Sequence, residues 1–319
     1  NTNNPLISII IPVYNGSSSI ENVVHTSIEK FKRFHQIEII LINDCSTDNT
    51  DQVCQKLQQD NVETITYLSL AKNFGEHNAV MAGLNYSIGD YVVIIDDDGQ
   101  NPPEEALKLI NYIMESEYDV VYSKYQKKNH NYFRNIGSWL NGKIANLILE
   151  KPPNLYLSSF KAISRFTVNE ITKYELSYPY IDGLIFRSTS NIGTLQTKHL
   201  PRSSGKSGYN LIKLMRIWLN MFTNFSVLPL RLASFTGFLL ASTGISLGIF
   251  TIYERILDPY LPVGWASLLV VVSILGGVQL IALGLIGEYL GRVFLGLNKQ
   301  PQFVIRETRM KKFKKSSAQ

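Results

Sequence analysis

The sequence predicts an α/β protein with a mostly parallel sheet, followed by a membrane-associated segment, and three observations support this. Short apolar runs that suit strands buried on both faces alternate with segments of helical apolar spacing in the first half of the chain. Polar residues directly follow several of these runs, as expected where such a sheet binds a ligand. Between residues 209 and 297 the composition becomes overwhelmingly apolar. The alternation favours parallel strands joined by covering helices.

The expected elements follow from the spacing of the apolar residues. Strands are predicted at residues 7–13, 37–42, 64–70 and 91–95, with a further one around 120–121. Helices are predicted at residues 20–34, 50–59, 76–86 and 131–149, with another that begins at Pro102. A pair of strands is predicted over residues 184–200, turned at Asn191-Ile192-Gly193.

Two segments, residues 232–253 and 265–286, contain no charged residue. Each is longer than the ~20 residues that cross a bilayer core, so both are predicted to span a membrane. Arg231 precedes the first segment, and Arg292 and Lys299 follow the second. The positive-inside rule therefore predicts a multi-pass protein of the inner membrane with its N-terminal domain and C-terminus in the cytoplasm.

The segment before these spans, residues 209–228, has a broad apolar face with Lys206, Lys213 and Arg216 near its start. This pattern predicts an amphipathic helix in the membrane interface, and a packed helix of the soluble domain is the alternative. The predicted divisions are a cytoplasmic domain at 1–205, the interface helix at 206–230, a transmembrane hairpin at 231–298 and a basic cytoplasmic tail at 299–319.

The net charge is +5, from 31 Lys and Arg against 26 Asp and Glu, and the excess is concentrated in the tail. A basic tail suits nucleic acid or an anionic lipid surface. The apolar segments before it favour lipid, so no nucleic-acid partner is predicted.

Cys45 and Cys54 lack partners at metal-binding spacing and are predicted to be free thiols. A homo-oligomer is compatible with these spans.

The acidic run Asp96-Asp97-Asp98-Gly99-Gln100 directly follows a predicted buried strand. Three adjacent carboxylates repel one another, and a divalent cation relieves that repulsion. In an extended segment Asp96 and Asp98 point the same way and Asp97 points the other way. Asp96 and Asp98 are therefore predicted to share Mg²⁺ or Mn²⁺, with an acidic helix-capping turn as the alternative.

Polar residues also follow two other predicted strands. Tyr14 and Asn15 follow the first, and Asp44 ends the second, where a carboxylate can accept a hydrogen bond from a base or a ribose. Ser46 and Asp48 lie just before the second helix and are predicted to cap it.

The order of these motifs resembles that of family 2 glycosyltransferases, which have the GT-A fold. The motif residues are Ile10-Ile11-Pro12-Val13-Tyr14-Asn15, Ile42-Asn43-Asp44, Ala71-Lys72-Asn73-Phe74-Gly75 and the acidic run with Pro102-Pro103-Glu104. Residues 202–209, 229–231 and 287–292 resemble the polyprenyl-phosphate branch, which includes dolichyl-phosphate mannose synthases, undecaprenyl-phosphate glucosyltransferases and aminoarabinose transferases.

The resemblance implies a role for each matching residue. Asp96, Asp98 and Arg202 would be catalytic, with Asp96, Asp98 and Gln100 on the metal; Pro12, Tyr14, Asn15, Asp44, Lys72 and Asp97 would bind the nucleotide; Arg134, Ser138 and Lys206 would bind the acceptor phosphate. Arg134 and Ser138 are four residues apart in a predicted helix and so share a face. The implied reaction moves a sugar, with inversion, from a nucleotide-diphosphate sugar, UDP-linked in bacterial relatives, to a polyprenyl phosphate such as undecaprenyl phosphate.

Four positions depart from the family pattern. Gly16 replaces a common Glu, Asp97 a common Ala, and Ser159 an acid of glucosyl and mannosyl relatives, while Lys206 is displaced from its usual place. These departures leave the transferred sugar open, and the sequence does not choose UDP over GDP or Mg²⁺ over Mn²⁺.

Three alternative functions remain. A processive polysaccharide synthase is disfavoured by the small number of spans, and a nucleotidyltransferase by the absence of its N-terminal phosphate loop. A non-catalytic membrane partner is disfavoured by the intact acidic run.

Overall fold

The computed structural model describes residues 5–125, 155–198, 200, 228–257, 264–298 and 300–312. The chain separates into two compact units. The first contains Asn1–Tyr209 together with Lys299–Gln319, and the second is Asn210–Asn298. The first unit therefore contains segments from both sides of the apolar region in the sequence.

The first unit is built on one eight-stranded sheet, counted over the described residues, in the order β7-β5-β6-β4-β1-β2-β3-β8. Its strands are β1 (Leu6–Val13), β2 (Gln36–Asn43), β3 (Ile65–Leu70), β4 (Tyr91–Ile94), β5 (Val120–Tyr125), β6 (Lys161–Ser164), β7 (Ile192–Thr197) and β8 (Ile305–Arg309). The strands β1 to β4 run parallel, while β6 is antiparallel to β4 and β5, and β8 is antiparallel to β3. The carboxyl ends of β1 to β4 therefore meet at one edge of the sheet.

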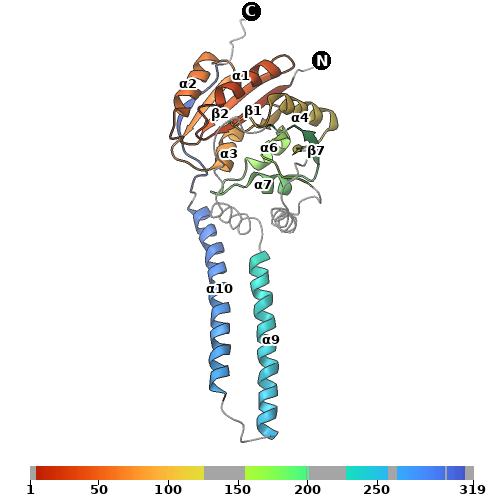
Figure 1. The fold of residues 1–319 in the computed structure, drawn as a ribbon, viewed down its shortest axis with the longest axis vertical. Helices are drawn as coiled ribbons and strands as arrows, with labels where there is room; N and C mark the ends of the chain where they lie inside the picture. The colour runs from red at the N-terminus through yellow and green to blue at the C-terminus, as the bar shows by residue number, and fades with distance from the viewer. Residues whose placement is uncertain are drawn as a thin grey trace, which may run out of the picture. The chain divides into compact units, whose positions relative to one another are not determined.

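Helices cover both faces of this sheet (Figure 1). On one face lie α1 (Ile20–Phe31), α2 (Thr50–Asp60) and α4 (Pro103–Ser116), and on the other lie α3 (Glu76–Tyr86), α6 (Arg165–Ile171) and α7 (Ile181–Ser188). Strand side chains alternate between the faces, so Ile9 packs beneath the first layer and Ile10 beneath the second. Gly83 of α3 lies so close to Ile10 and Ile42 that a Cβ there would overlap both.

The alternating pattern up to β5 is confirmed, with element ends within a few residues of those expected. The prediction for residues 184–200 is half wrong, because Ile181–Ser188 is a helix and only Ile192–Thr197 is a strand. Ile181, Leu184 and Ile185 are buried at helical spacing. Gly193 lies inside β7 rather than in a turn, and a Cβ there would overlap the Tyr118 ring.

The region predicted as a basic tail contains a strand. Ile305–Arg309 forms β8, which completes the sheet beside β3. Half-buried and exposed residues alternate along it, and an edge strand accommodates charged side chains such as Arg306 on its exposed side. Cys45 and Cys54 are free thiols, as predicted, and the Cys54 side chain is fully buried.

The second unit contains two long apolar helices, α9 (Leu228–Leu257) and α10 (Trp265–Leu297) (Figure 1). Within them, Ala233–Glu254 and Ile274–Gly291 are long and apolar enough to cross a membrane. Large apolar side chains such as Phe238 and Leu280 are about 70% exposed, at 69% and 71%. The predicted helix at 131–149 and the interface helix at 206–230, up to residue 227, lie outside the described residues.

Candidate active site

The loops at the carboxyl edge of the sheet share an unusual backbone conformation. Asn15 after β1, Cys45 after β2, Gly75 before α3 and Gly99 after β4 have φ of 55°, 56°, 92° and 72°. Only one other described residue, Glu117, has a positive φ. Left-handed conformations in non-glycine residues cost free energy and gather at functional sites, so this edge is the candidate site.

The loops after β1 and β2 are locked together by Asn15. Its backbone N–H donates to Ser46 Oγ at 3.0 Å, and its Oδ1 accepts from the backbone N–H of Thr47 at 2.8 Å. Tyr14, the preceding residue, leaves 50% of its surface exposed. An exposed aromatic ring on a rigid loop is a suitable surface for a planar ligand.

The two capping predictions have different outcomes. Asp48 Oδ1 accepts from the backbone N–H of Thr50, the first residue of α2, at 3.1 Å, so the predicted cap is present. Its Oδ2 also accepts from the Ser17 hydroxyl at 2.7 Å. Ser46 instead accepts the N–H of Asn15, so its hydroxyl joins two loops rather than capping the helix.

Asp44 holds the loop that leads into α3. Its Oδ1 accepts from the backbone N–H of Phe74 at 2.7 Å, and its Oδ2 accepts from that of Gly75 at 2.8 Å. Burial raises the pKa of Asp44, and these two hydrogen bonds partly offset the rise. The Lys72 ammonium lies 4.9 Å from the Phe74 ring centre in the same loop. Contact of Asp44 with a nucleoside stays a prediction, and its role in shaping this loop was not foreseen.

Asp96 is the first acid after β4. Its Oδ2 accepts from Ser159 Oγ and from Asn101 Nδ2, each at 2.8 Å. Burial raises the pKa of Asp96 to about 6, and the negative charge of Glu76 raises it further. Ser159 was noticed in the sequence only as a departure from relatives, and its contact with Asp96 comes from the antiparallel pairing of β6 with β4.

Asp97 contacts a different part of the edge. Its Oδ2 accepts from the backbone N–H of Tyr14 at 3.2 Å, and a Cβ on Gly16 would overlap that oxygen. Asp96 and Asp97 thus bond to different segments, as neighbours in an extended chain do. Two of the departures from the family pattern, at positions 16 and 97, therefore lie against each other.

Asp98 and Gln100 form the turn after β4. Asp98 Oδ1 accepts from the backbone N–H of Gln100 at 3.0 Å. Gln100 O accepts from the N–H of Leu200 at 2.9 Å, and its side-chain Nε2 donates to Leu200 O at 3.4 Å. The acidic turn is therefore tied to a residue close in sequence to Arg202. Arg134, Ser138, Arg202 and Lys206 themselves lie outside the described residues.

The acidic edge fits a divalent cation whose coordination a ligand completes. Among the described residues, no three His, Cys, Asp or Glu side chains gather as a complete protein cage would require. Asp96 and Asp98 nevertheless supply carboxylate oxygens two residues apart. Burial, and after it the negative charges of Glu76 and Asp98, raise the pKa of Asp96, and a cation would neutralise this charge. Mg²⁺ and Mn²⁺ prefer such oxygens and keep positions for phosphate oxygens.

A buried charged cluster beside this edge was missed by the sequence analysis. The Lys161 side chain, 3% exposed, forms an ion pair with Asp182 of α7, and Tyr122 donates to the same carboxylate at 2.8 Å. The ring of His77 packs edge-on against Tyr180, and burial lowers the pKa of His77 to about 4. Asp182 was missed because it lies just before residues 184–200, which were predicted as a pair of strands, and the start of α7 was not recognised.

Comparison with known proteins decides the class of this one. Residues 8–172, more than half of the chain, match glycosyl transferase family 2. The chain belongs to this family. The match spans β1 to α6 and thus all four loops of the acidic edge.

Relatives match over almost the full length. The undecaprenyl-phosphate 4-deoxy-4-formamido-L-arabinose transferase of Proteus mirabilis is 28% identical over 94% of this chain and 93% of its own. The enzyme of the same name from Serratia proteamaculans is 29% identical with the same coverage. An uncharacterized glycosyltransferase of Bacillus subtilis is 28% identical over 94% of this chain and 93% of its own.

A solved structure supports the GT-A-like fold. Glucosyl-3-phosphoglycerate synthase from Mycobacterium tuberculosis, in complex with Mn²⁺, UDP and phosphoglyceric acid, superposes with a TM-score of 0.50. It is 18% identical and covers 68% of this chain and 75% of its own. At this identity the likeness concerns the fold alone.

Proposed function

We propose that this protein transfers a sugar, with inversion, from a nucleotide-diphosphate sugar, UDP-linked, to a polyprenyl phosphate such as undecaprenyl phosphate. The product is a lipid-linked sugar for modification of cell-envelope glycans. The observation that carries this proposal is the match to undecaprenyl-phosphate transferases over 94% of the chain, which includes both apolar helices.

The donor occupies the carboxyl edge of the sheet. Tyr14, Asn15, Asp44 and Asp97 surround the nucleoside, and Pro12 and Lys72 complete its pocket. Asp96 and Asp98, with Gln100, would hold Mg²⁺ or Mn²⁺, which would neutralise the charge of the leaving diphosphate. The Mycobacterium tuberculosis synthase of similar fold was solved with Mn²⁺ and UDP, which supports this choice of ligands.

The acceptor needs little activation. A phosphate monoester has a second pKa of about 6, so a polyprenyl phosphate is already an anionic nucleophile near neutral pH. The protein therefore supplies position and charge rather than a strong general base. Arg134, Ser138, Arg202 and Lys206 hold the acceptor phosphate in line with the sugar carbon.

The apolar helices bring this chemistry to a membrane. The residues before α9 and after α10 contribute strands to one sheet, so both flanks of the hairpin lie on the same side of a bilayer. Two crossings satisfy this requirement and a single crossing does not. The cations at the ends of the two apolar segments support a cytoplasmic location for that side.

The test is turnover by the full chain purified in detergent. The protein is incubated with undecaprenyl phosphate, Mg²⁺ or Mn²⁺, and a panel of UDP- and GDP-sugars, and nucleoside diphosphate release is measured. Release that requires both the lipid and the metal supports the proposal, and the active donor identifies the sugar. Release without the lipid refutes the acceptor assignment. UDP binding without metal dependence or turnover favours a non-catalytic partner instead.

A further inference from the structure

After the apolar helices the chain returns to the sheet at its acidic edge. Val304 O accepts from the backbone N–H of Ala71 at 2.8 Å, and the Arg306 guanidinium donates to Ala71 O at 3.0 Å. Ala71 begins the loop whose Phe74 and Gly75 bind Asp44. The start of β8 therefore holds both backbone groups of the residue from which this loop departs.

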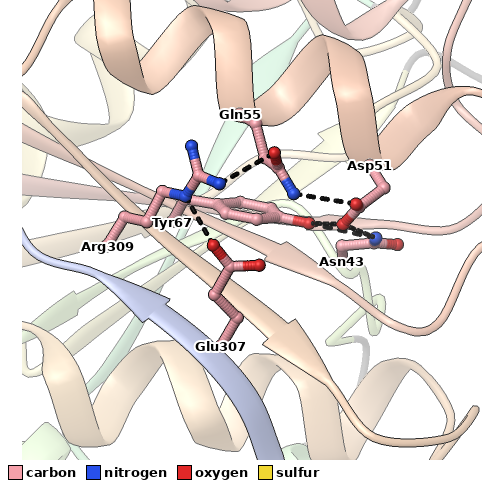
Figure 2. Close-up of polar contacts among 6 residues, drawn as sticks. All are labelled: Asn43, Asp51, Gln55, Tyr67, Glu307 and Arg309. Atoms are coloured by element: carbon pink, nitrogen blue, oxygen red, sulfur yellow. Dashed lines mark hydrogen bonds and ion pairs between the residues drawn. The ribbon is translucent and has the colours of Figure 1, made fainter.

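A second connection runs from the far end of β8 into α2 (Figure 2). Arg309 Nε forms an ion pair with Glu307 at 2.6 Å, and its Nη2 donates to Gln55 Oε1 at 2.8 Å. Gln55 Nε2 in turn donates to Asp51 Oδ2 at 2.8 Å. Arg309 thus orients the Gln55 amide so that its N–H₂ faces Asp51.

The same network ends at the loops of the candidate site. Asp51 accepts from the Tyr67 hydroxyl and, at 3.2 Å, from Asn43 Nδ2 (Figure 2). Asn43, 2% exposed, uses its Oδ1 to accept from the backbone N–H of Ser46 at 3.0 Å. Ser46 Oγ accepts from Asn15 N–H at 3.0 Å. Hydrogen bonds therefore extend from Arg309 through α2 to the loops after β2 and β1.

We propose that Arg306 and Arg309 are positioning residues for the nucleoside diphosphate of the donor. Strand β8 holds the loops after β1, β2 and β3 in the arrangement that binds the nucleotide, through Ala71 at one end and through Gln55 and Asp51 at the other. This inference rests on the proposed function for the nature of the ligand. Buried polar networks fix one arrangement when every member is satisfied, which is the condition seen at Asn43 and Asp51.

If β8 served only as the outermost strand beside β3, a different result would be expected. Variants of either arginine would then have lower stability without a specific change in nucleotide binding. Arg165 is a matched control for Arg309 because both are half-buried, and Arg165 donates to Gly89 O at 2.7 Å and to Ser87 Oγ at 3.2 Å. Those partners lie at the start of β4, at the opposite edge of the sheet.

The experiment uses the full chain in detergent and measures the binding of UDP and GDP in the presence of Mn²⁺ by calorimetry. Arg309→Ala and Arg306→Ala are expected to weaken binding of the preferred nucleotide by roughly 5- to 20-fold, the scale of one or two lost hydrogen bonds. Arg309→Lys, which keeps the positive charge on one donor nitrogen, is expected to recover part of the loss. Arg165→Ala is expected to lower the melting temperature with binding within about 2-fold of the original protein.

Hydrogen exchange provides a readout that needs no ligand. The backbone N–H groups of Phe74 and Gly75 are expected to exchange faster in Arg306→Ala, and that of Ser46 faster in Arg309→Ala, with no such change in Arg165→Ala. Unchanged nucleotide binding and unchanged exchange in both β8 variants would overturn the inference and leave β8 a structural strand. If the original protein binds neither UDP nor GDP, the donor assignment fails and this role fails with it.

Discussion

The two edges of the sheet both bury acids, but they compensate them differently. At the edge where the parallel strands begin, Glu38 is 2% exposed and lies 2.6 Å from Lys311, which follows β8. At the edge where these strands end, Asp96 accepts from the neutral groups of Ser159 and Asn101, and burial raises its pKa to about 6. Glu38 is therefore compensated by a lysine of the chain itself, whereas the hydrogen-bond donors to Asp96 are neutral groups.

This difference separates a structural acid from a functional one. A buried carboxylate with a built-in cation and several hydrogen bonds needs nothing from outside, as at Glu38, which also accepts from Ser8 and Ile88. A carboxylate whose pKa is raised by burial and by neighbouring acids, as at Asp96, is typical of a functional site, where a ligand or metal can supply the cation. Four variants test this contrast, in order of decreasing expected effect.

The largest effect is expected for Asp98→Asn. The substitution keeps the shape of the side chain and removes one charge from the predicted metal site, so turnover is expected to fall by roughly 10³-fold or more, about 4 kcal/mol in the barrier. Nucleoside diphosphate release measures this, with the melting temperature as a check on folding. Asp60→Asn, an exposed acid at the end of α2, is the control and is expected to leave turnover unchanged. A fully active Asp98→Asn protein would refute the metal assignment.

At the opposite edge, Lys311→Met is expected to destabilise the fold. It leaves Glu38 buried without its cation, which typically costs about 3–5 kcal/mol. Thermal unfolding in detergent measures the loss. The double variant Glu38→Gln/Lys311→Met is expected to recover part of it, because the buried charge is gone. Equal destabilisation of the single and double variants would mean that charge compensation is not the role of Lys311.

A pH-dependent effect is expected from His77, beside the acidic edge. Its pKa of about 4 in the folded protein lies below the ordinary 6.5, so the unfolded chain binds more protons between these values. Its contribution to stability is therefore complete above pH 6.5 and falls as the pH drops, by about 2 kcal/mol at pH 5. His77→Gln is expected to reduce the loss of melting temperature between pH 7.5 and 5. An identical pH dependence in both proteins would contradict the assignment.

The smallest effect is expected for Gly16→Ala. The added Cβ would displace the Asp97 carboxylate from Tyr14 N–H, so UDP affinity is expected to fall by roughly 5-fold, about 1 kcal/mol. Calorimetry with UDP and Mn²⁺ measures it. The double variant Gly16→Ala/Asp97→Ala relieves this overlap by removing the Asp97 carboxylate. Recovery of stability without recovery of affinity would assign Asp97 to nucleotide binding, and recovery of both would limit its role to packing against Gly16.

Local patterns predicted the acidic edge because its residues directly follow strands with a clear apolar signal. Asp44 and Asp96 could be placed at the same edge of the sheet from the ends of β2 and β4 alone. The contacts of these acids could not be predicted in this way. Asp44 binds the backbone 30 residues away, at Phe74, and Asp96 is reached by Ser159 only because β6 pairs with β4.

The predictions for residues 184–200 and for the C-terminal tail were partly wrong because the local sequence patterns there are weak. Residues 181–188 contain buried positions at helical spacing, but the segment is short and the glycine at position 193 suggested a turn. That glycine is required by the close approach of β7 to the Tyr118 ring, which no local pattern reveals. Residues 305–309 include three charged side chains and one apolar one, a composition that is equally compatible with an exposed tail and with an edge strand.

The sequence by itself determined the parallel sheet, the acidic run and the two apolar segments, because periodicity, charge repulsion and hydrophobic length act between residues close in the chain. Only the tertiary structure decided that β8 joins the sheet, that Lys311 compensates Glu38 and that Arg309 connects to Asn43 through α2. These interactions join residues more than 200 positions apart. Their free energy depends on burial and geometry that exist only after the chain has folded.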